Sequence, residues 1–256
     1  MAQGDGRDFS TWQGDARLAA AFLTRLPFGG DARAEPGALA RAAWAFPVVG
    51  ILVGLIGGIA FAIGDRLGLP INAMALLAVA VTVLMTGGLH EDGLADTMDG
   101  LGGGADREQA LSIMRDSRTG AFGVLALVFS VGLRVAALAA LPDVRIAVSA
   151  LLAAHAMSRG LLPTLMLWLD PARSDGLAAE AGRPTPPGAT AAALIGLVVA
   201  MVALGIGRGI LAMILAGVAI MAMALLARRR IGGYTGDVLG ASQQVGEIVI
   251  LLAASV

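Results

Sequence analysis

Cysteine and lysine are both missing from this 256-residue chain, and charged residues of any kind are scarce. Without cysteine, the chain can form neither a disulfide nor a thiolate metal site. Charged side chains make up 14% of the residues and hydrophobic ones 57%, whereas a soluble domain carries roughly 25% charge. So much apolar surface exceeds what one soluble core can bury, and the composition therefore predicts a polytopic membrane protein.

Seven apolar runs are suited to cross a bilayer, which takes about 20 residues per helix. The last run is less apolar because it holds Gln243, Gln244 and Glu247. We expect an all-α polytopic bundle of about seven transmembrane helices with short interfacial helices, forming one domain over residues 1–256. The expected spans are 44–64, 70–89, 119–141, 146–168, 189–207, 210–227 and 239–256.

The N-terminal segment, residues 1–43, lacks the basic start and apolar stretch of a signal peptide. Within it, "ARLAAAFLTRLPF" places Leu18, Phe22, Leu23 and Leu26 near one helical face. This pattern predicts a helix that lies in the membrane interface or packs onto the bundle.

The arginines divide unevenly between the two sides of the expected membrane layer. With alternating spans, only Arg66, Arg145 and Arg208 fall in loops on one side, while Arg134 and Arg159 lie within spans. The remaining thirteen belong to the N-terminal segment and the 90–118, 170–188 and 228–238 loops. Because basic loops stay in the cytoplasm, we expect an inner-membrane protein whose N-terminus and active site face the cytoplasm.

The stretch "GGLHEDGLADTMDGLGGG", residues 87–104, places acidic side chains directly after an uncharged run. On a helix continuing from the second span, Asp92, Asp96 and Asp99 share one face. Three carboxylates on one face repel one another, and Mg²⁺, or alternatively Mn²⁺, would remove that conflict. We therefore predict a metal–diphosphate site in an acidic catalytic loop region, residues 90–118. The alternative is that these aspartates have a structural role only, as caps of helix ends.

Two neighbours complete the candidates in this stretch. Glu91 is a fourth candidate metal ligand, and His90 a candidate substrate-binding residue. Downstream, "DREQALSIMRDSRTG" predicts a short interfacial helix with Asp106 and Gln109 at capping-box spacing. Its end would deliver Asp116 as a candidate catalytic group, with Arg115 and Arg118 as clamps on phosphate oxygens or as ordinary topology anchors.

Two later clusters add candidate substrate-binding residues. In the fourth span, "HAMSRG" gives Ser158 and Arg159, and an arginine flanked by apolar runs is expected to face the bundle interior. Near the C-terminus, "YTGDVLGASQQVGE" places Asp237, Gln244 and Glu247 on one helical side.

These same stretches carry a family resemblance along nearly the whole chain. "DGLADTMDG" before "MRDSRTGAFG", with "FLTRLPF", "SRG" and "YTGDVLGASQQVGE" in the same order, resembles the cobalamin synthases, also called adenosylcobinamide-GDP ribazoletransferases. Met98 departs from the small residue expected there, but lies off the aspartate face. The resemblance implies a membrane-bound, Mg²⁺-dependent transferase that joins adenosylcobinamide-GDP to α-ribazole or its 5′-phosphate. The products would be adenosylcobalamin or its 5′-phosphate, and GMP.

Such a reaction would depend on positioning and charge neutralisation. Asp92, Asp96 and Asp99 would hold the metal on the diphosphate, Asp99 or Asp116 would take the proton of the ribazole hydroxyl, and Arg118 and Arg159 would stabilise phosphate charge. We expect small-molecule substrates and membrane lipid as partners, and no nucleic acid.

Other functions remain open at this point. A CDP-alcohol phosphotransferase or a prenyltransferase would also use clustered aspartates, although this stretch lacks their second acidic motif. An ion-coupled transporter would line a path with Arg159 and Glu247, near the midplane. The sequence does not determine the oligomeric state, and a homo-oligomer is possible. It also leaves open the number of metal ions, the general base, how the corrinoid is bound and which acceptor is preferred.

Overall fold

The computed structural model describes residues 9–28 and 36–256, the side chains of Phe9 and Ser10 excepted. Over these ranges the chain is helical, and its one strand-like contact is an isolated bridge between Pro171 and Tyr234. The elements are α1 Phe9–Leu23, α2 Ala38–Ala42, η1 Ala43–Ala45, α3 Phe46–Arg66, α4 Ile71–Thr86, α5 Leu89–Gly103, α6 Arg107–Ile113, α7 Ala121–Ala139, α8 Val144–Trp168, α9 Leu177–Ala181, α10 Pro186–Leu204, α11 Ile206–Ile231 and α12 Gly236–Ala254.

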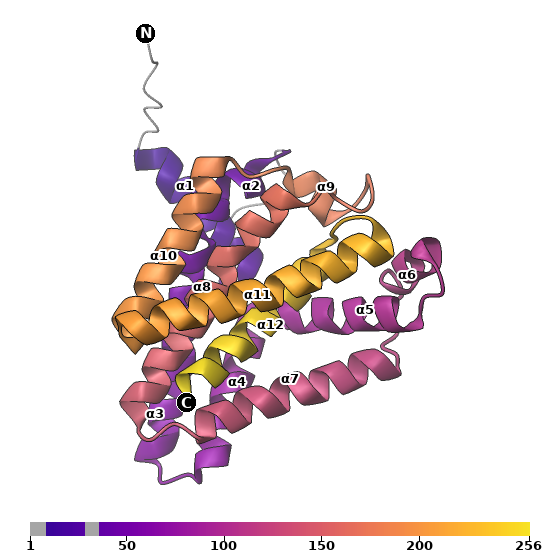
Figure 1. Ribbon diagram of the computed structural model, residues 1–256. Coiled ribbons are helices and arrows are strands. Elements are labelled where there is room, and N and C mark those ends of the chain that lie inside the picture. Colours follow the sequence, from indigo (N-terminus) through magenta and orange to yellow (C-terminus); the bar gives the residue numbers. More distant parts are fainter. Residues whose placement is uncertain (1–8, 29–35) are drawn as a thin grey trace.

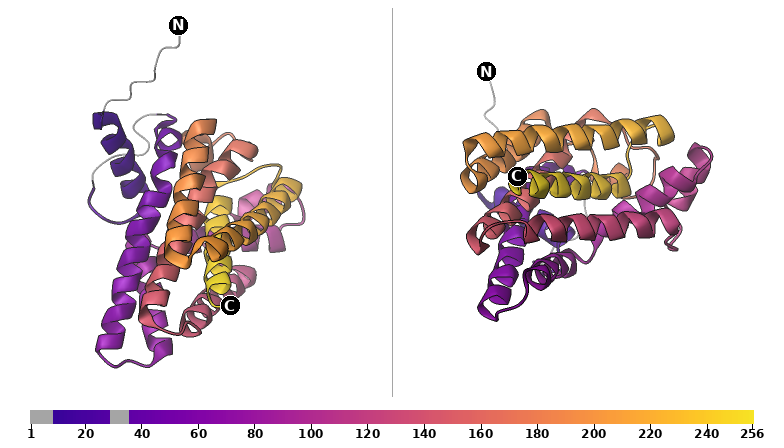
Figure 2. Two further views of the ribbon diagram at one scale, coloured as in Figure 1. Left: turned by 60° about the vertical axis from the view of Figure 1, so that its left-hand side comes forward. Right: turned by 60° about the horizontal axis from the view of Figure 1, so that its bottom comes forward.

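The membrane helices form two groups that meet at the pair α8 and α12. α8 contacts both α3 and α10, and α4 lies against α3. α12 lies between α11 and α5, and α7 covers the other side of α5. Figures 1 and 2 show the two groups running in different directions, with α7, α11 and α12 roughly alongside one another.

The expected membrane architecture is confirmed. Among the described residues, six helices are long and apolar enough to span, and the bent pair α4–α5 counts as a seventh span when its two halves are taken together. Apolar side chains line their outer faces, as Leu84 on α4, Phe129 on α7 and Val202 on α10 illustrate with exposures of 75%, 63% and 82%. Lipid would cover these surfaces.

Local sequence explains where several helices begin. Thr185 and Thr235 accept hydrogen bonds from the backbone N–H groups of Gly188 and Val238, three residues ahead. Asp106 accepts from the N–H of Gln109 at 2.9 Å, as the capping-box spacing predicts, whereas the side chain of Gln109 turns to the N–H of Ala105. Such caps satisfy N–H groups that the first helical turn leaves free.

The largest difference from expectation is the bend between α4 and α5. We expected the acidic residues on a straight continuation of the second span and in a loop, but the chain turns by 90° and stays helical to Gly103. Gly87 and Gly88 have φ values of 67° and 70°, a conformation that residues with a Cβ rarely adopt. This pair ends α4 and redirects the chain between α7 and α12.

Two smaller expectations were also off. A single residue, Gly205, separates α10 from α11, so the fifth span ends earlier than expected. α11 then continues to Ile231, which places Arg228–Arg230 in its last turn instead of a loop. Of the N-terminal segment, residues 1–8 and 29–35 lie outside the described residues, whereas α1 packs onto α2, η1 and α3.

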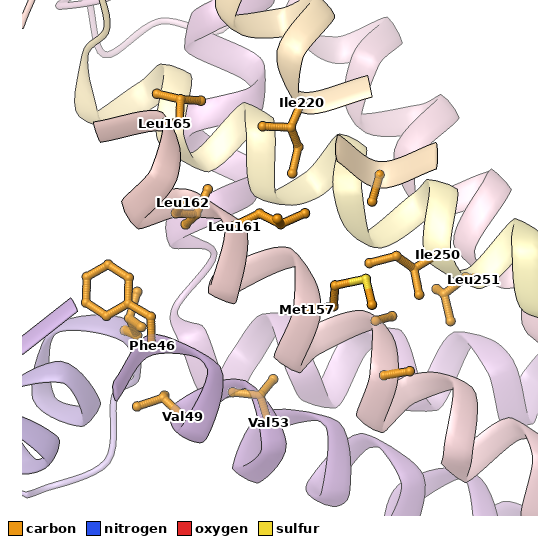
Figure 3. Close-up of a cluster of buried hydrophobic side chains, with 14 of the residues drawn as sticks. Phe46, Val49, Val53, Met157, Leu161, Leu162, Leu165, Ile220, Ile250 and Leu251 are labelled. Atoms are coloured by element: carbon orange, nitrogen blue, oxygen red, sulfur yellow. The ribbon is translucent and has the colours of Figure 1, made fainter. Parts of the chain in front are cut away.

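The core is built mainly from small and medium apolar residues. Figure 3 shows Phe46, Val49 and Val53 of α3 near Met157, Leu161 and Leu162 of α8, with Ile250 and Leu251 of α12 beyond them. α3 and α8 approach so closely that a Cβ on Gly54 would lie 2.6 Å from the carbonyl oxygen of Leu151. Small residues at membrane helix interfaces allow this approach.

Candidate functional site

The site is organised by the crossing of α5 and α12. A Cβ on Gly93 would lie 2.8 Å from the carbonyl oxygen of Asp237 and 3.1 Å from the Cα of Gly240. No larger residue than glycine fits this crossing without displacing backbone. The contact brings the acidic face of α5 against the first turn of α12.

Three carboxylates meet beside this crossing: Asp92 and Asp96 from α5 and Asp237 from α12, which we call the carboxylate cluster. Asp92, Asp237 and Asp99 each lie close enough to Asp96 to repel its charge. Neither Asp92 nor Asp96 accepts a hydrogen bond from another described residue, and Asp237 accepts one from the hydroxyl of Thr235 at 3.0 Å. The cluster therefore has carboxylate oxygens available to a ligand.

The other two predicted metal ligands have protein partners. Asp99 is 6% exposed, and its two oxygens accept the backbone N–H groups of Gly120 and Gly123 at 2.6 and 2.8 Å. It thus stabilises the start of α7. This is the helix-capping role that the sequence also allowed in place of metal binding. Glu91 accepts hydrogen bonds from Arg134 and Gln244 at 3.0 and 3.1 Å.

Over the ranges that the structure describes, no group of three or more Asp, Glu or His side chains is arranged so that it could hold a metal ion. The donors of the carboxylate cluster are nevertheless oxygens, the type that Mg²⁺ prefers, and their mutual repulsion favours a cation. The chemistry of the donor set therefore fits Mg²⁺.

Behind the cluster, charged and polar side chains form a buried ion network inside the bundle. Arg134 of α7 is 1% exposed and pairs with Glu91 at 3.0 Å and Glu247 at 3.2 Å. His155 and Gln243 also contact Glu247, at 3.3 and 2.7 Å. Removing one member of such a pair leaves a buried charge without compensation, so the network fixes α5, α7, α8 and α12 relative to one another.

Four predicted substrate-binding residues belong to this network. Ser158 accepts a hydrogen bond from Gln243, and Gln244 joins Glu91 to Ser130. Arg159 is 1% exposed and contacts the ring of His155 at 3.0 Å. The expectation that Arg159 faces the bundle interior is confirmed. Ser158, Arg159, Gln244 and Glu247 all contact other protein groups.

A basic hollow of about 820 Å³ lies between α6 and the loop after α8. Arg107, Arg115 and Arg173 line it together with Asp175. Arg115 makes a two-pronged ion pair with Asp175 at 2.7 and 2.8 Å. An excess of fixed positive charge in a hollow attracts phosphate groups.

The loop between α6 and α7 holds the remaining candidates. Asp116 and Arg118 pair with each other at 2.6 Å, and the side chain of Arg118 is 87% exposed. Hydrogen bonds from Arg118 lower the pKa of Asp116 to about 2, which makes this carboxylate a weak base near neutral pH. Thr119, in the same loop, lines a further hollow with Glu91 and Asp92, so the loop does reach the acidic helix.

Sequence reasoning missed three residues. Arg134 stood out as a charge inside an apolar run, a recognised signal of function in membrane helices, but its partners could not be foreseen. Arg173 lines both the basic hollow and a smaller pocket that also contains His90, Asp92 and Asp237. Its place, like that of Arg107, depends on the folding of the loop after α8, for which the sequence has no local signal.

Fold and site together define a class: a polytopic membrane protein with clustered carboxylates beside an arginine-lined hollow, suited to phosphorylated substrates. The family model described as cobalamin-5-phosphate synthase matches residues 15–255, and the chain belongs to this family. It is therefore a membrane transferase of cobalamin synthesis. No solved structure was found to match it.

Curated relatives resemble the chain over almost all of its length. A protein of Bradyrhizobium diazoefficiens is 53% identical over 94% of this chain and 93% of its own. One of Mesorhizobium japonicum is 50% identical over 94% and 93%, and one of Azorhizobium caulinodans is 45% identical over 93% and 94%. All three are named adenosylcobinamide-GDP ribazoletransferase. Family membership decides against the CDP-alcohol phosphotransferase, prenyltransferase and transporter alternatives.

Proposed function

We propose that the chain transfers the cobinamide phosphate of adenosylcobinamide-GDP to α-ribazole or its 5′-phosphate. The products would be adenosylcobalamin or its 5′-phosphate, and GMP. One observation carries the proposal: in a chain of this family, the carboxylate cluster lies close to an arginine-lined hollow, with Arg173 lining both that hollow and the pocket that contains Asp92 and Asp237.

In this reaction a ribazole hydroxyl oxygen forms a bond to the phosphorus on the cobinamide side, and the bond from that phosphorus to the GMP oxygen breaks. Arg107, Arg115 and Arg173 would bind the phosphates of the donor and offset their charge. A carboxylate near the acceptor must take the hydroxyl proton. Asp92 and Asp237 suit this role better than Asp99, whose oxygens are bonded to α7, or Asp116, whose pKa is low.

Asp96 and one of Asp92 and Asp237 would hold Mg²⁺, or Mn²⁺ as the alternative, since Mg²⁺ usually takes one or two carboxylates together with phosphate oxygens. The other of Asp92 and Asp237 would then remain available to take the proton. When bound, the ion would neutralise charge on the diphosphate. Asp99 leaves the proposed ligand set because backbone N–H groups bind both of its oxygens. Glu91 leaves it because its charge is already paired with Arg134 through Oε1, although its Oε2 has no hydrogen-bond partner among the described residues.

The proposed setting is the bacterial inner membrane, with the carboxylate cluster toward the cytoplasm. Arg115, Arg118, Arg173 and Arg228–Arg230 all lie near this end of the molecule, where α7 and α12 begin, and basic loops are retained in the cytoplasm.

The test is turnover by the purified chain in detergent, given adenosylcobinamide-GDP and ribazole 5′-phosphate, with and without Mg²⁺. We expect a cobalamin product and GMP in equal amounts, none after chelation, and recovery when Mg²⁺ is restored. Asp96→Asn should lower kcat by at least about a thousandfold, since a charged metal ligand becomes a neutral one. Asp143→Asn is the matched control, because asparagine caps α8 as well as aspartate does and Asp143 only accepts the N–H of Ile146.

Full activity in Asp96→Asn, or turnover unaffected by chelation, would remove the metal assignment. Release of pyrophosphate or of another nucleotide in place of GMP would overturn the reaction itself.

A further inference from the structure

The small pocket that Arg173 shares with Asp92 and Asp237 has no ligand assigned to its interior in the function proposed so far. It measures about 120 Å³ and lies where α1, α3, α5, α8 and α12 come together. We call it the base pocket. Its inner wall consists of buried apolar side chains, namely Leu23, Phe46 and Leu162, each 2–3% exposed. Figure 3 shows Phe46 and Leu162 within the buried cluster between α3 and α8.

One polar residue interrupts this apolar wall. His90 lines the pocket and is 3% exposed, and its Nε2 has no hydrogen-bond partner among the described residues. Because neighbouring atoms cover Nε2, the ring must rotate for a ligand in the pocket to reach it. A buried polar atom that lacks a partner costs free energy, so a ligand able to bond to it would be favoured at this position. The wall therefore suits an apolar group that carries one hydrogen-bonding atom.

The rim of the pocket has the opposite character. Asp92 and Asp237 of the carboxylate cluster line it, and so does Arg173. Nη1 of Arg173 is also buried without a partner within the described part of the chain. A ligand seated here would have its apolar end inside and its polar end, a sugar or a phosphate, among these charged groups.

Building on the proposed function, we propose that the base pocket binds the benzimidazole base of the ribazole acceptor, with His90 Nε2 hydrogen-bonded to its free ring nitrogen. The ribose then lies at the rim beside Asp92 and Asp237, and a 5′-phosphate meets Arg173. This orientation brings the attacking hydroxyl to the carboxylate cluster.

The size and chemistry of the pocket select this part of the substrates. The volume of about 120 Å³ is slightly below the roughly 150 Å³ of a cavity that accepts a benzene ring. A flat base therefore fits only if it also uses the open rim, whereas a corrin ring cannot enter. The half-buried Leu177 and Leu239 and the open rim leave room for a second ring. The guanine of the donor carries several polar edge groups that these walls could not satisfy.

The decisive variant is Leu162→Phe, which fills the pocket from its inner wall. In the full-length protein, we expect the KM for ribazole 5′-phosphate to rise by about tenfold or more, while the KM for adenosylcobinamide-GDP stays within about twofold. Calorimetric titration with ribazole 5′-phosphate alone should show the same weakening without turnover. Leu161→Phe is the matched control: Leu161 precedes it on α8 and is 9% exposed, but does not line the pocket.

His90 gives a second measurement. His90→Ala should weaken ribazole 5′-phosphate binding by about five- to tenfold, the value of one hydrogen bond, and His90→Gln, which keeps a side-chain N–H, should restore part of it. If Leu162→Phe fails to fold, Leu239→Phe fills the pocket from its half-buried side.

The outcomes separate this inference from the proposed function. Unchanged acceptor affinity in the filled variants, or an equal loss of donor affinity, overturns the base pocket while turnover by the wild type still supports the function. A lipid acyl chain released from the filled variant, with both KM values unchanged, would assign the pocket to lipid. If the wild type neither binds nor uses ribazole 5′-phosphate, the proposed function fails as well.

Discussion

At the scale of single residues, the aspartates of one helix face have different tasks. Asp92, Asp96 and Asp99 share a face of α5, as their spacing predicts, yet only Asp99 accepts hydrogen bonds from backbone N–H groups, those of Gly120 and Gly123. Sequence spacing gives the face on which a side chain lies but not what packs against it. The start of α7, some twenty residues further along the chain, decides the role of Asp99.

This division of tasks predicts opposite effects for two substitutions. Asp99→Ala should lower the free energy of unfolding by about 1–2 kcal/mol, because two N–H groups at the start of α7 lose their acceptor. Asp96→Ala should leave stability unchanged or raised, because it relieves the repulsion from Asp92 and Asp237, while turnover is lost. Thermal unfolding in detergent and kcat would be measured for both. Equal stability of the two variants would contradict the capping role of Asp99.

At the scale of helices, the spans were predictable and their bends and partners were not. A run such as residues 71–86 is apolar in itself, so composition alone predicts that it crosses the membrane. The turn at Gly87–Gly88 depends on what α5 meets afterwards, and the pairing of Arg134 with Glu91 and Glu247 joins helices far apart in the sequence. Asp237 was a candidate from its place in the C-terminal motif. That it lies beside Asp96 follows only from the crossing of α5 and α12.

That crossing is open to a direct test with Gly93→Ala. The added methyl group would lie 2.8 Å from the carbonyl oxygen of Asp237, so α5 and α12 must separate by a few tenths of an ångström. We expect a loss of stability of about 1–3 kcal/mol from overpacking and a fall in kcat of about tenfold or more, as the carboxylates part. Gly132→Ala on α7 is the control, because no atom outside its own stretch of helix lies within 4 Å of its Cβ position. Wild-type activity in Gly93→Ala would show that the close crossing is not needed.

At the scale of the whole molecule, charge is distributed toward one end. The carboxylate cluster, the basic hollow and the arginines that close α11 lie toward the end of the molecule where α8 and α11 end and α7 and α12 begin. Direct hydrogen bonds join these parts: Arg230 donates to the carbonyl oxygens of Leu101 and Gly104, and Arg107 to those of Ile231 and Ala172. The arginines predicted to fix the orientation therefore also hold the loops of the site together.

The absence of cysteine makes the orientation directly measurable, because each introduced cysteine is unique. Ser112→Cys places a thiol on the exposed side of α6, the helix that lines the basic hollow, and Leu67→Cys places one after α3, where Leu67 is 70% exposed. With the cluster toward the cytoplasm, a membrane-impermeant maleimide should label Leu67→Cys in intact spheroplasts and Ser112→Cys only after the membrane is permeabilised. The unsubstituted chain, which has no thiol, sets the background. Labelling of Ser112→Cys from outside would place the cluster on the opposite side of the membrane, out of reach of cytoplasmic nucleotide substrates. Labelling of both positions before permeabilisation would mean that α3 does not separate the two faces.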